Sequence, residues 1–416
     1  MDHQRTLTKL SGNAVVAVVC AAQVFVQIGA FFWPALLPQL VPRWNLSNSD
    51  AGWITAAFYG AYMLGVPVLV PLTDRIDAKK VYLFGVGATI LGHLMFGLYA
   101  DGFWSALVLR ALTGFGWAGT YMTGVKLLAD QVDERLMSRA VTGHAASIGV
   151  SGALSFSCAG LLDQAYGWRT AFVVAASSAA IAFALVGFFV AAAKRRKTRQ
   201  GETLTLFDFR PVLRNRSALA YSLAYCVHTL EMSALRGWGV AFLGFVAISP
   251  QADGTQLSPA YVLTLLGLIG TVASVLGNEA AIRVGRRTLV SVAMAASVIA
   301  GCTIGVAGAI SYWTAVAVLL VYGFIVWLDS SSLTAGAAGT ADPARRGATL
   351  AVHSTLGYAG GFVGPLIIGF ALDMAGGMST AAWSVAFGSV ATLMLLALIT
   401  FRAMRPRDLV GDRSTQ

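Results

Sequence analysis

The stretch AKRRKTRQGETLTLFDFRPVLRNR (residues 193–216) is the longest polar connection between the apolar runs of this chain. It is strongly basic and too charged to enter a lipid bilayer, whereas the sequence on either side of it is dominated by long apolar runs. The stretch therefore divides the chain into two halves, and we interpret it as a polar linker between them.

The composition indicates that most of the chain lies in lipid. Of the 416 residues, 57% are hydrophobic and only 12% are charged, whereas a soluble domain has about 25% charged residues. A surface so poor in charge would not keep a protein of this size in water, which argues against a soluble protein with a large core. The net charge of +10 does not indicate nucleic acid, because the basic residues lie in short connections between apolar runs.

Twelve apolar runs are long enough to cross a bilayer, which requires about 20 residues. They are 13–40, 51–72, 81–100, 103–128, 139–163, 169–192, 217–246, 259–282, 288–310, 312–338, 347–372 and 379–402. We predict an all-α membrane protein with twelve transmembrane helices in two pseudo-symmetric six-helix bundles. The expected parts are an N-terminus (1–12), two bundles (13–192 and 217–402), the linker (193–216) and a tail (403–416).

The basic residues predict the orientation. If the N-terminus is inside, nearly all Lys and Arg lie in the inner connections, and the outer loops keep only Arg43 and Arg169. Inner loops of membrane proteins carry an excess of Lys and Arg, so both termini are expected to be cytoplasmic. The first apolar run is too long for the core of a signal peptide, and we expect it to be retained as the first span.

The two halves also resemble each other in sequence. PLTDRIDAKK (71–80) follows the second span, and AAIRVGRR (280–287) follows the eighth, about 208 residues later. Aligning the fifth and eleventh spans brings His144 opposite His353; for both histidines we favour a packing role. Repeated halves are common in transporters and support a duplicated bundle of six plus six helices.

With these motifs, the chain resembles the major facilitator superfamily of secondary transporters over residues 13–402. RALTGFG (110–116) and YGWRTAF (166–172) are similar to family patterns in the fourth and sixth spans. The family has a charged motif in the loops after spans two and eight, and this chain keeps it in part. In the loop after span eight, Ile282 stands where the family has an acid. The resemblance implies that spans one, four, seven and ten line a central cavity, and that a bacterial cytoplasmic membrane holds a functional monomer. Loop residues expected to act in gating, or only in anchoring at lipid headgroups, are Asp74, Arg75, Lys79, Arg283, Arg286 and Arg287.

Span seven contains three ionisable residues in the apolar stretch YCVHTLEMSALRGWGVAFL (225–243). Such residues are costly in mid-membrane unless they face a partner or a wet cavity. His228 and Glu231 are three residues apart and can touch on one helix face, so we expect a proton-carrying pair. Arg236 lies farther along the same face and is expected to attract an anion. The alternative is a set of charges that only ties span seven to its neighbours.

Spans one, four and ten supply the other candidates. Asp329 in span ten is a candidate proton carrier, with structural pairing to an arginine as the alternative. Candidate substrate contacts are Arg236, Arg110, Gln23, Gln27, Tyr121 and Tyr322. For Arg110, a structural role as a hydrogen-bond donor to helix carbonyls is an equally good interpretation. The glutamines are equally consistent with helix–helix contacts.

No motif for a cofactor, a metal or an enzymatic nucleophile is present in the sequence, so we expect neither an enzyme nor a cofactor. The leading hypothesis is a secondary active transporter that uses alternating access and takes up a small organic anion with protons. Membrane lipid is the expected surrounding, and no nucleic-acid partner is expected. The alternatives are a proton-coupled exporter of drugs or metabolites and, from another class, a membrane sensor that moves no solute.

Overall fold

The computed structural model describes residues 11–73, 75–192, 210–250 and 256–413. The regular secondary structure of these residues is entirely helical, and none of them forms a β-strand. Within these described ranges, ten helices are long and apolar enough to cross a membrane, and α1 is a shorter apolar helix. The prediction of an all-α membrane protein is confirmed.

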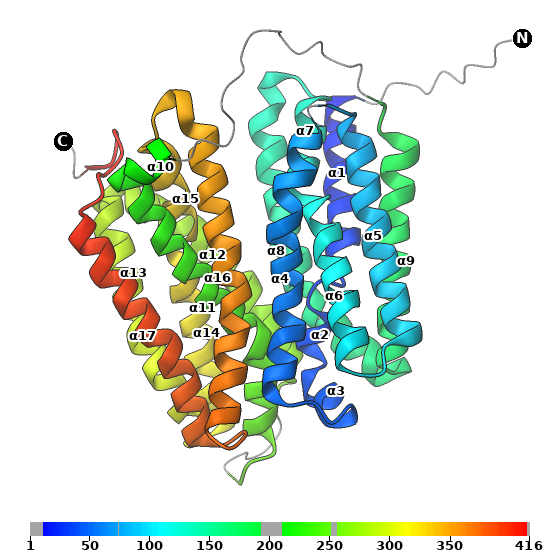
Figure 1. The fold of residues 1–416 in the computed structure, drawn as a ribbon, viewed down its shortest axis with the longest axis vertical. Coiled ribbons are helices and arrows are strands. Elements are labelled where there is room, and N and C mark those ends of the chain that lie inside the picture. The colour runs from blue at the N-terminus through cyan, green and yellow to red at the C-terminus, as the bar shows by residue number, and fades with distance from the viewer. Residues whose placement is uncertain (1–10, 74, 193–209, 251–255, 414–416) are drawn as a thin grey trace, which may run out of the picture. The chain divides into compact units, whose positions relative to one another are not determined.

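The chain folds into two compact units, whose helices are labelled in Figure 1. The first unit (unit 1) contains residues 1–32 and 61–200, and the second (unit 2) contains residues 33–60 and 201–416. Helix α4 (Asn48–Leu72) therefore contributes to both. The other helices of unit 1 are α1 (Gly12–Gln27), α5 (Ala78–Tyr99), α6 (Phe103–Ala118), α7 (Tyr121–Ala129), α8 (Glu134–Tyr166) and α9 (Trp168–Phe189).

Unit 2 begins with two short helices, α2 (Phe32–Ala35) and α3 (Leu37–Arg43). Its remaining helices are α10 (Arg210–Arg214), α11 (Arg216–Ala247), α12 (Pro259–Val284), α13 (Arg286–Ala307), α14 (Tyr312–Leu328), α15 (Ser330–Gly339), α16 (Arg346–Met374) and α17 (Thr380–Met404). A 3₁₀ turn at Pro343–Arg345 precedes α16.

Three of the apolar runs are interrupted rather than continuous helices. The first is split into α1, α2 and α3, with Pro38 in the first turn of α3, a position that tolerates the missing N–H of proline. The fourth is split into α6 and α7 around Gly119, and the tenth into α14 and α15 at Asp329. Apolar length predicts a span but does not show where its helix is broken.

Helices α11 and α16 pack very closely because α16 has glycine at the contact. A Cβ atom built on Gly360 would lie 1.9 Å from the carbonyl oxygen of Cys226, and one on Gly364 would lie 2.1 Å from that of Leu230. No side chain fits there, so the glycines allow the two backbones to approach each other. The indole of Trp238 also donates to the carbonyl of Pro365 at 2.9 Å. This packing fixes the position of α11, which carries three of the candidate residues, His228, Glu231 and Arg236.

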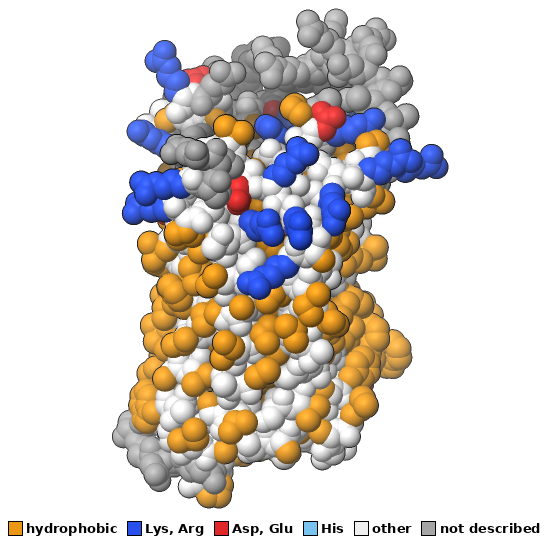
Figure 2. All heavy atoms as spheres, turned by 90° about the vertical axis from the view of Figure 1, so that its left-hand side faces the viewer, with side chains coloured by type: hydrophobic (Ala, Val, Ile, Leu, Met, Phe, Trp, Pro, Cys, Tyr) orange, Lys and Arg blue, Asp and Glu red, His pale blue; other side chains and the backbone are white. Residues whose placement is uncertain are grey.

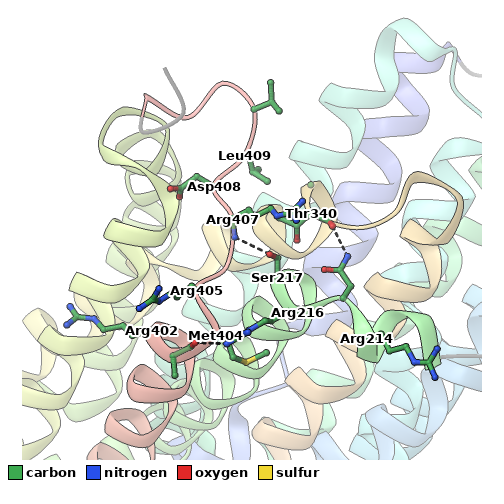
Figure 3. A pocket seen from close by; sticks show the side chains of 14 residues that line it. Arg214, Arg216, Ser217, Thr340, Arg402, Met404, Arg405, Arg407, Asp408 and Leu409 are labelled. Carbon is green, nitrogen blue, oxygen red and sulfur yellow. Dashed lines mark hydrogen bonds between the residues drawn. The ribbon is translucent and has the colours of Figure 1, made fainter.

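Charge and apolar surface are separated along the helices. Figure 2 shows Lys and Arg side chains gathered at one end of the visible face, above a surface rich in hydrophobic side chains. In unit 2 the exposed apolar residues include Val275, Ile299, Leu396 and Ile399. At the charged end of this unit, the ends of α10, α15 and α17 surround a pocket (Figure 3).

Candidate functional site

Glu231 is the first ionisable group of a buried polar cluster in unit 2. Its side chain lies in α11 and is 1% exposed. The hydroxyl of Tyr322, from α14, donates to the carboxylate oxygen Oε1 of Glu231 at 2.7 Å. Tyr322 was predicted as a substrate contact, and it stays a prediction; in the structure its hydroxyl has this carboxylate as a partner. A tyrosine hydroxyl can donate to a carboxylate or accept from a carboxylic acid, so this contact is compatible with either protonation state.

His228 and Asp329 form the second buried pair. The Nδ1 atom of His228 lies 2.9 Å from Oδ1 of Asp329, and both residues are almost fully buried. The expected partner of His228 was Glu231, one helical turn away; among the described residues its ion pair is with Asp329 instead. The reason is the break between α14 and α15, which begins at Asp329. The alternative pairing of Asp329 with an arginine is likewise replaced by this histidine.

His353 extends the cluster, although the sequence favoured only a packing role for it. Its two ring nitrogens lie 3.3 Å from the hydroxyl of Ser222 and 3.1 Å from that of Thr334. The ring of Tyr225 stacks on His353 at 4.1 Å and on His228 at 5.7 Å between centroids. Two histidines therefore flank one tyrosine in the interior of unit 2. The alignment of His353 with His144 was the only sequence signal for this position.

Arg236 is the remaining ionisable residue of the apolar stretch in α11. It is partly exposed, and its guanidinium carbon lies 4.6 Å from the ring centroid of Trp327. Trp327 is in α14, two residues before Asp329. A guanidinium that stacks on a ring contacts it through its flat face, in a cation–π interaction. Such a group can bind a carboxylate without leaving the aromatic ring.

Arg110, in unit 1, has a different environment. It is 2% exposed, and its Nη2 donates to the carbonyl of Ala30 at 3.0 Å. Ala30 lies between α1 and α2, where the helix is interrupted and carbonyl groups lose their helical partners. This bond fits the structural alternative that the sequence left open for Arg110.

The predicted glutamines of unit 1 bond to each other. Nε2 of Gln23 donates to Oε1 of Gln27 at 3.2 Å, and the hydroxyl of Tyr82 lies 3.4 Å from Oε1 of Gln23. Both glutamines are buried. Tyr121, just after the break between α6 and α7, stacks with His144 at 6.2 Å, and a ring nitrogen of His144 lies 3.0 Å from the Tyr121 carbonyl. These contacts connect helices within unit 1.

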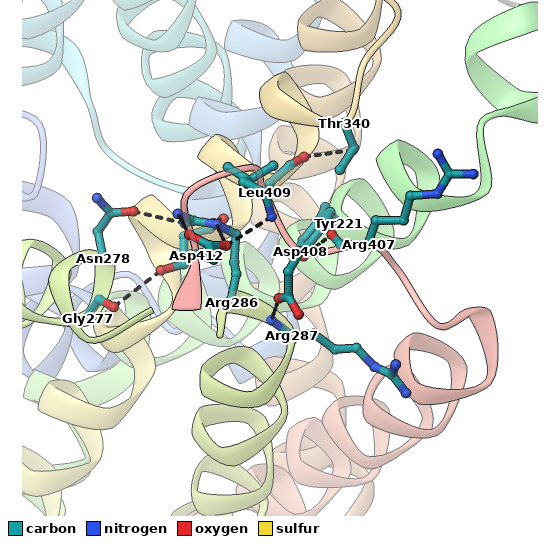
Figure 4. A network of polar contacts seen from close by, with 12 residues as sticks. Tyr221, Gly277, Asn278, Arg286, Arg287, Thr340, Arg407, Asp408, Leu409 and Asp412 are labelled. Atoms are coloured by element: carbon teal, nitrogen blue, oxygen red, sulfur yellow. Dashed lines mark hydrogen bonds and ion pairs between the residues drawn. The ribbon is translucent and has the colours of Figure 1, made fainter. Parts of the chain in front are cut away.

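The predicted gating residues of unit 2 have well-defined partners (Figure 4). Arg286 is 3% exposed; its guanidinium lies 3.4 Å from both carboxylate oxygens of Asp412 and donates to Asn278 at 2.9 Å. The backbone N–H of Arg287 donates to Asp408 at 2.6 Å. Sequence reasoning missed both tail aspartates. Asp412 provides an acid for a loop motif that has Ile282 at its own acidic position.

The other predicted gating residues are more exposed or bond to backbone. Arg283 pairs with Glu279 at 2.8 Å on the surface of α12. In unit 1, Nζ of Lys79 donates to the carbonyls of Gly187 and Val190, at 2.8 and 2.6 Å, where α9 ends. Arg75 is exposed. Asp74 lies outside the described residues.

This arrangement of helices and motifs agrees with a comparison of the sequence with known families. The model of the Major Facilitator Superfamily matches residues 18–328. The chain belongs to the Major Facilitator Superfamily (MFS).

Curated relatives in the MFS include transporters with different named roles. Human protein spinster homolog 1 is 26% identical over 287 residues, covering 66% of this chain and 54% of the relative. The 4-hydroxybenzoate transporter PcaK of Acinetobacter baylyi is 25% identical over 177 residues, covering 42% of this chain and 38% of PcaK. The chain spans about half the length of the first of these relatives.

Solved MFS structures share the fold over nearly the whole chain. A bacterial homolog of the human lysosomal transporter Spinster, inward-facing and occupied, matches with a TM-score of 0.75 and 15% identity. That match covers 94% of this chain and 96% of the homolog. The nucleoside transporter NupG matches with a TM-score of 0.74 and 12% identity, covering 96% of this chain and all of NupG. At these identities the matches show the fold alone.

Proposed function

We propose that this MFS transporter takes up a small organic anion together with protons, by alternating access of two six-helix bundles (13–192 and 217–402). The observation that carries the proposal is the pair of buried carboxyl groups in unit 2. Glu231 accepts a hydrogen bond from a tyrosine and Asp329 pairs with a histidine; among the described residues neither carboxyl group forms an ion pair with an arginine that would hold it ionised.

The carboxyl groups of Glu231 and Asp329 can carry a proton across the membrane, because the protonated form has no charge to bury. A buried carboxylate is expensive, and protonation removes its charge. The Nδ1 atom of His228 lies 2.9 Å from Oδ1 of Asp329, close enough for a proton to pass between the two groups. Binding a proton from outside and releasing it inside would then couple transport to the proton gradient.

The anion is assigned to Arg236 because of its exposure and its stacking on Trp327. An arginine offers paired N–H donors that match the two oxygens of a carboxylate. The related PcaK is named for 4-hydroxybenzoate, an aromatic carboxylate, which is consistent with this class of substrate. Arg110, Gln23, Gln27 and Tyr121 remain proposed substrate contacts in unit 1.

The charged residues of the loops after the second and eighth spans also have a role in the proposed transport cycle. We propose that Arg75, Lys79, Arg283, Arg286 and Arg287, with Asp74, act in gating on the cytoplasmic side. The concentration of Lys and Arg in these loops supports cytoplasmic termini in a bacterial inner membrane. We expect the transporter to work as a monomer.

The test is uptake by the purified protein in liposomes. A panel of labelled small carboxylates, with a nucleoside as a neutral solute, is supplied with and without an inward proton gradient. Wild-type protein should accumulate one carboxylate only with the gradient. Arg236→Gln should bind that carboxylate about 10–100-fold more weakly, because a hydrogen bond to a charged group contributes about 1.5–3 kcal/mol.

Glu231→Gln should lose coupling but keep binding. The amide keeps an oxygen for the Tyr322 hydroxyl but cannot carry a proton, so exchange of labelled for unlabelled carboxylate should continue without accumulation. Two matched controls are Arg169→Gln, which removes a surface arginine stacked on Trp168 at 4.7 Å, and Asp101→Asn in an exposed turn. Equal gradient-driven uptake in wild type and both site variants would refute the proposal, as would uptake of the nucleoside alone.

A further inference from the structure

The pocket at the charged end of unit 2 has no part in the proposed transport cycle. It encloses about 1230 Å³ between the ends of α10, α15 and α17, the start of α11 and the segment that follows α17 (Figure 3). Its lining residues are Arg214, Asn215, Arg216, Ser217, Gly339, Thr340, Arg402, Ala403, Met404, Arg405, Arg407, Asp408, Leu409 and Val410. A cavity of this size can hold the headgroup of a lipid.

The lining is strongly basic. It contains five arginines and one aspartate, and that aspartate, Asp408, already accepts from the backbone of Arg287. Arg216 donates to the carbonyl of Ala403 at 2.8 Å. Within the described part of the chain, the other four guanidinium groups, those of Arg214, Arg402, Arg405 and Arg407, form no ion pair. Guanidinium groups with free donors bind the oxygens of phosphate groups in pairs.

The walls of the pocket are held in place by bonds that do not use these arginine side chains. The backbone N–H of Arg407 donates to Ser217 at 3.1 Å, and the hydroxyl of Tyr221 donates to the Arg407 carbonyl at 2.9 Å. On another wall, Asn215 donates to the carbonyl of Thr340 at 2.8 Å. The pocket is therefore formed before a ligand binds, which lowers the ordering cost of binding.

Apolar surface leads directly to the pocket. Leu396 and Ile399 on α17 are 54% and 56% exposed, and Arg402 follows Ile399 by three residues on the same helix face. Leu213, 52% exposed, precedes Arg214 on α10. An acyl chain can lie along this apolar stripe of α17 while the attached headgroup reaches the arginines. A soluble phosphate compound would gain nothing from the stripe.

From the charge, the preformed walls and the apolar stripe together, we propose that this pocket binds the phosphate-bearing headgroup of an anionic phospholipid. Basic pockets between transmembrane helices are suited to acidic headgroups. The site would make one face of unit 2 selective for anionic lipid, and this selectivity is independent of the transported solute.

The test measures lipid binding by the purified full-length protein. Native mass spectrometry from mild detergent would follow titrations with phosphatidylglycerol and with phosphatidylcholine. The wild type should retain phosphatidylglycerol in preference to phosphatidylcholine. Arg402→Gln/Arg407→Gln should weaken phosphatidylglycerol binding at least about tenfold, because two charges at the site are removed.

A matched double variant distinguishes lipid binding at the pocket from a general effect of the protein's net charge on lipid binding. Arg135→Gln/Arg139→Gln removes two exposed arginines of unit 1 and changes the net charge equally. It should change phosphatidylglycerol binding by less than about twofold. An equal loss in both double variants, or no loss in the pocket variant, would overturn the proposal.

Two further measurements keep the result unambiguous. If Arg402→Gln/Arg407→Gln proves unstable, Arg214→Gln on α10 tests the opposite wall, and it should weaken phosphatidylglycerol binding about threefold or more. Glycerol phosphate is then added as a competitor. If it displaces phosphatidylglycerol at equal concentration, the site takes soluble phosphates and the lipid proposal is wrong; the expected result is that the lipid stays bound.

Discussion

The interiors of the two units contain different kinds of ionisable group. The buried charged or titratable residues of unit 1 include Arg110, His93 and His144, beside the two glutamines. In unit 2 they include Glu231, Asp329, His228 and His353. Among the described residues, every buried carboxyl group lies in unit 2.

This difference suggests a division of roles. Buried hydrogen bonds in unit 1 involve neutral amides and one arginine that is bonded to a carbonyl. In unit 2, carboxyl groups meet partners that allow a change of protonation state. We infer that the proton-carrying step belongs to unit 2, whereas unit 1 contributes shape and hydrogen-bond donors.

The largest expected effect comes from breaking the His228–Asp329 pair. Asp329→Ala should lower the free energy of unfolding by about 3–5 kcal/mol, because it leaves a buried partner without its counter-charge. The double variant His228→Ala/Asp329→Ala should be less destabilised than the sum of the two single variants. Thermal and denaturant unfolding in detergent would measure this coupling. Additive losses would show that the pair is not a coupled unit.

A second comparison uses the two arginines. Arg110→Gln should lower the free energy of unfolding by about 1.5–3 kcal/mol, because a charged donor to the Ala30 carbonyl is lost. Arg236→Gln removes a partly exposed cation from Trp327 and should cost only about 0.5–1 kcal/mol. Measuring stability and carboxylate binding for both variants sharpens the contrast. If Arg110→Gln abolished binding while the protein stayed fully stable, Arg110 would act as a substrate contact only, and its structural role would be refuted.

The smallest effect is expected from the glutamine pair of unit 1. Gln27→Leu should lower the free energy of unfolding by only about 0.2–0.5 kcal/mol, since a hydrogen-bonded pair at i and i+4 on one helix contributes on that scale. Because Gln27 is also a proposed substrate contact, the variant should bind carboxylate more weakly, but the ratio of accumulation with and without the proton gradient, measured by uptake in liposomes, should not change. A loss of coupling in this variant would remove the proposed division between the units.

Much of the fold could be predicted because it depends on local composition. Apolar length predicted the helical spans, and buried acids such as Glu231 and Asp329 stood out because lipid penalises them. The glycines of α16 allow the close packing against α11, as the contacts of Gly360 and Gly364 show.

The partners of these residues could not be predicted, since they come from distant parts of the chain. Glu231 and Tyr322 are 91 residues apart, and the bond between Arg286 and Asp412 spans 126 residues. A one-turn spacing suggested that His228 contacts Glu231, but the interruption at Asp329 supplied a different partner. Helix breaks depend on tertiary packing as much as on sequence. The spacing of residues on one helix was therefore not enough to predict the partner of His228.

The burial of α11 also has a consequence for the biogenesis of the protein. Of the ten long helices, α11 is the most buried, and it carries a histidine, a glutamate and an arginine. When it leaves the ribosome, Tyr322 is still 91 residues away, which is about 5–18 s of synthesis at 5–20 residues per second. During that interval the insertion machinery or water must satisfy groups that lipid rejects. The helix best suited to carry protons in the finished transporter is therefore the hardest one to insert.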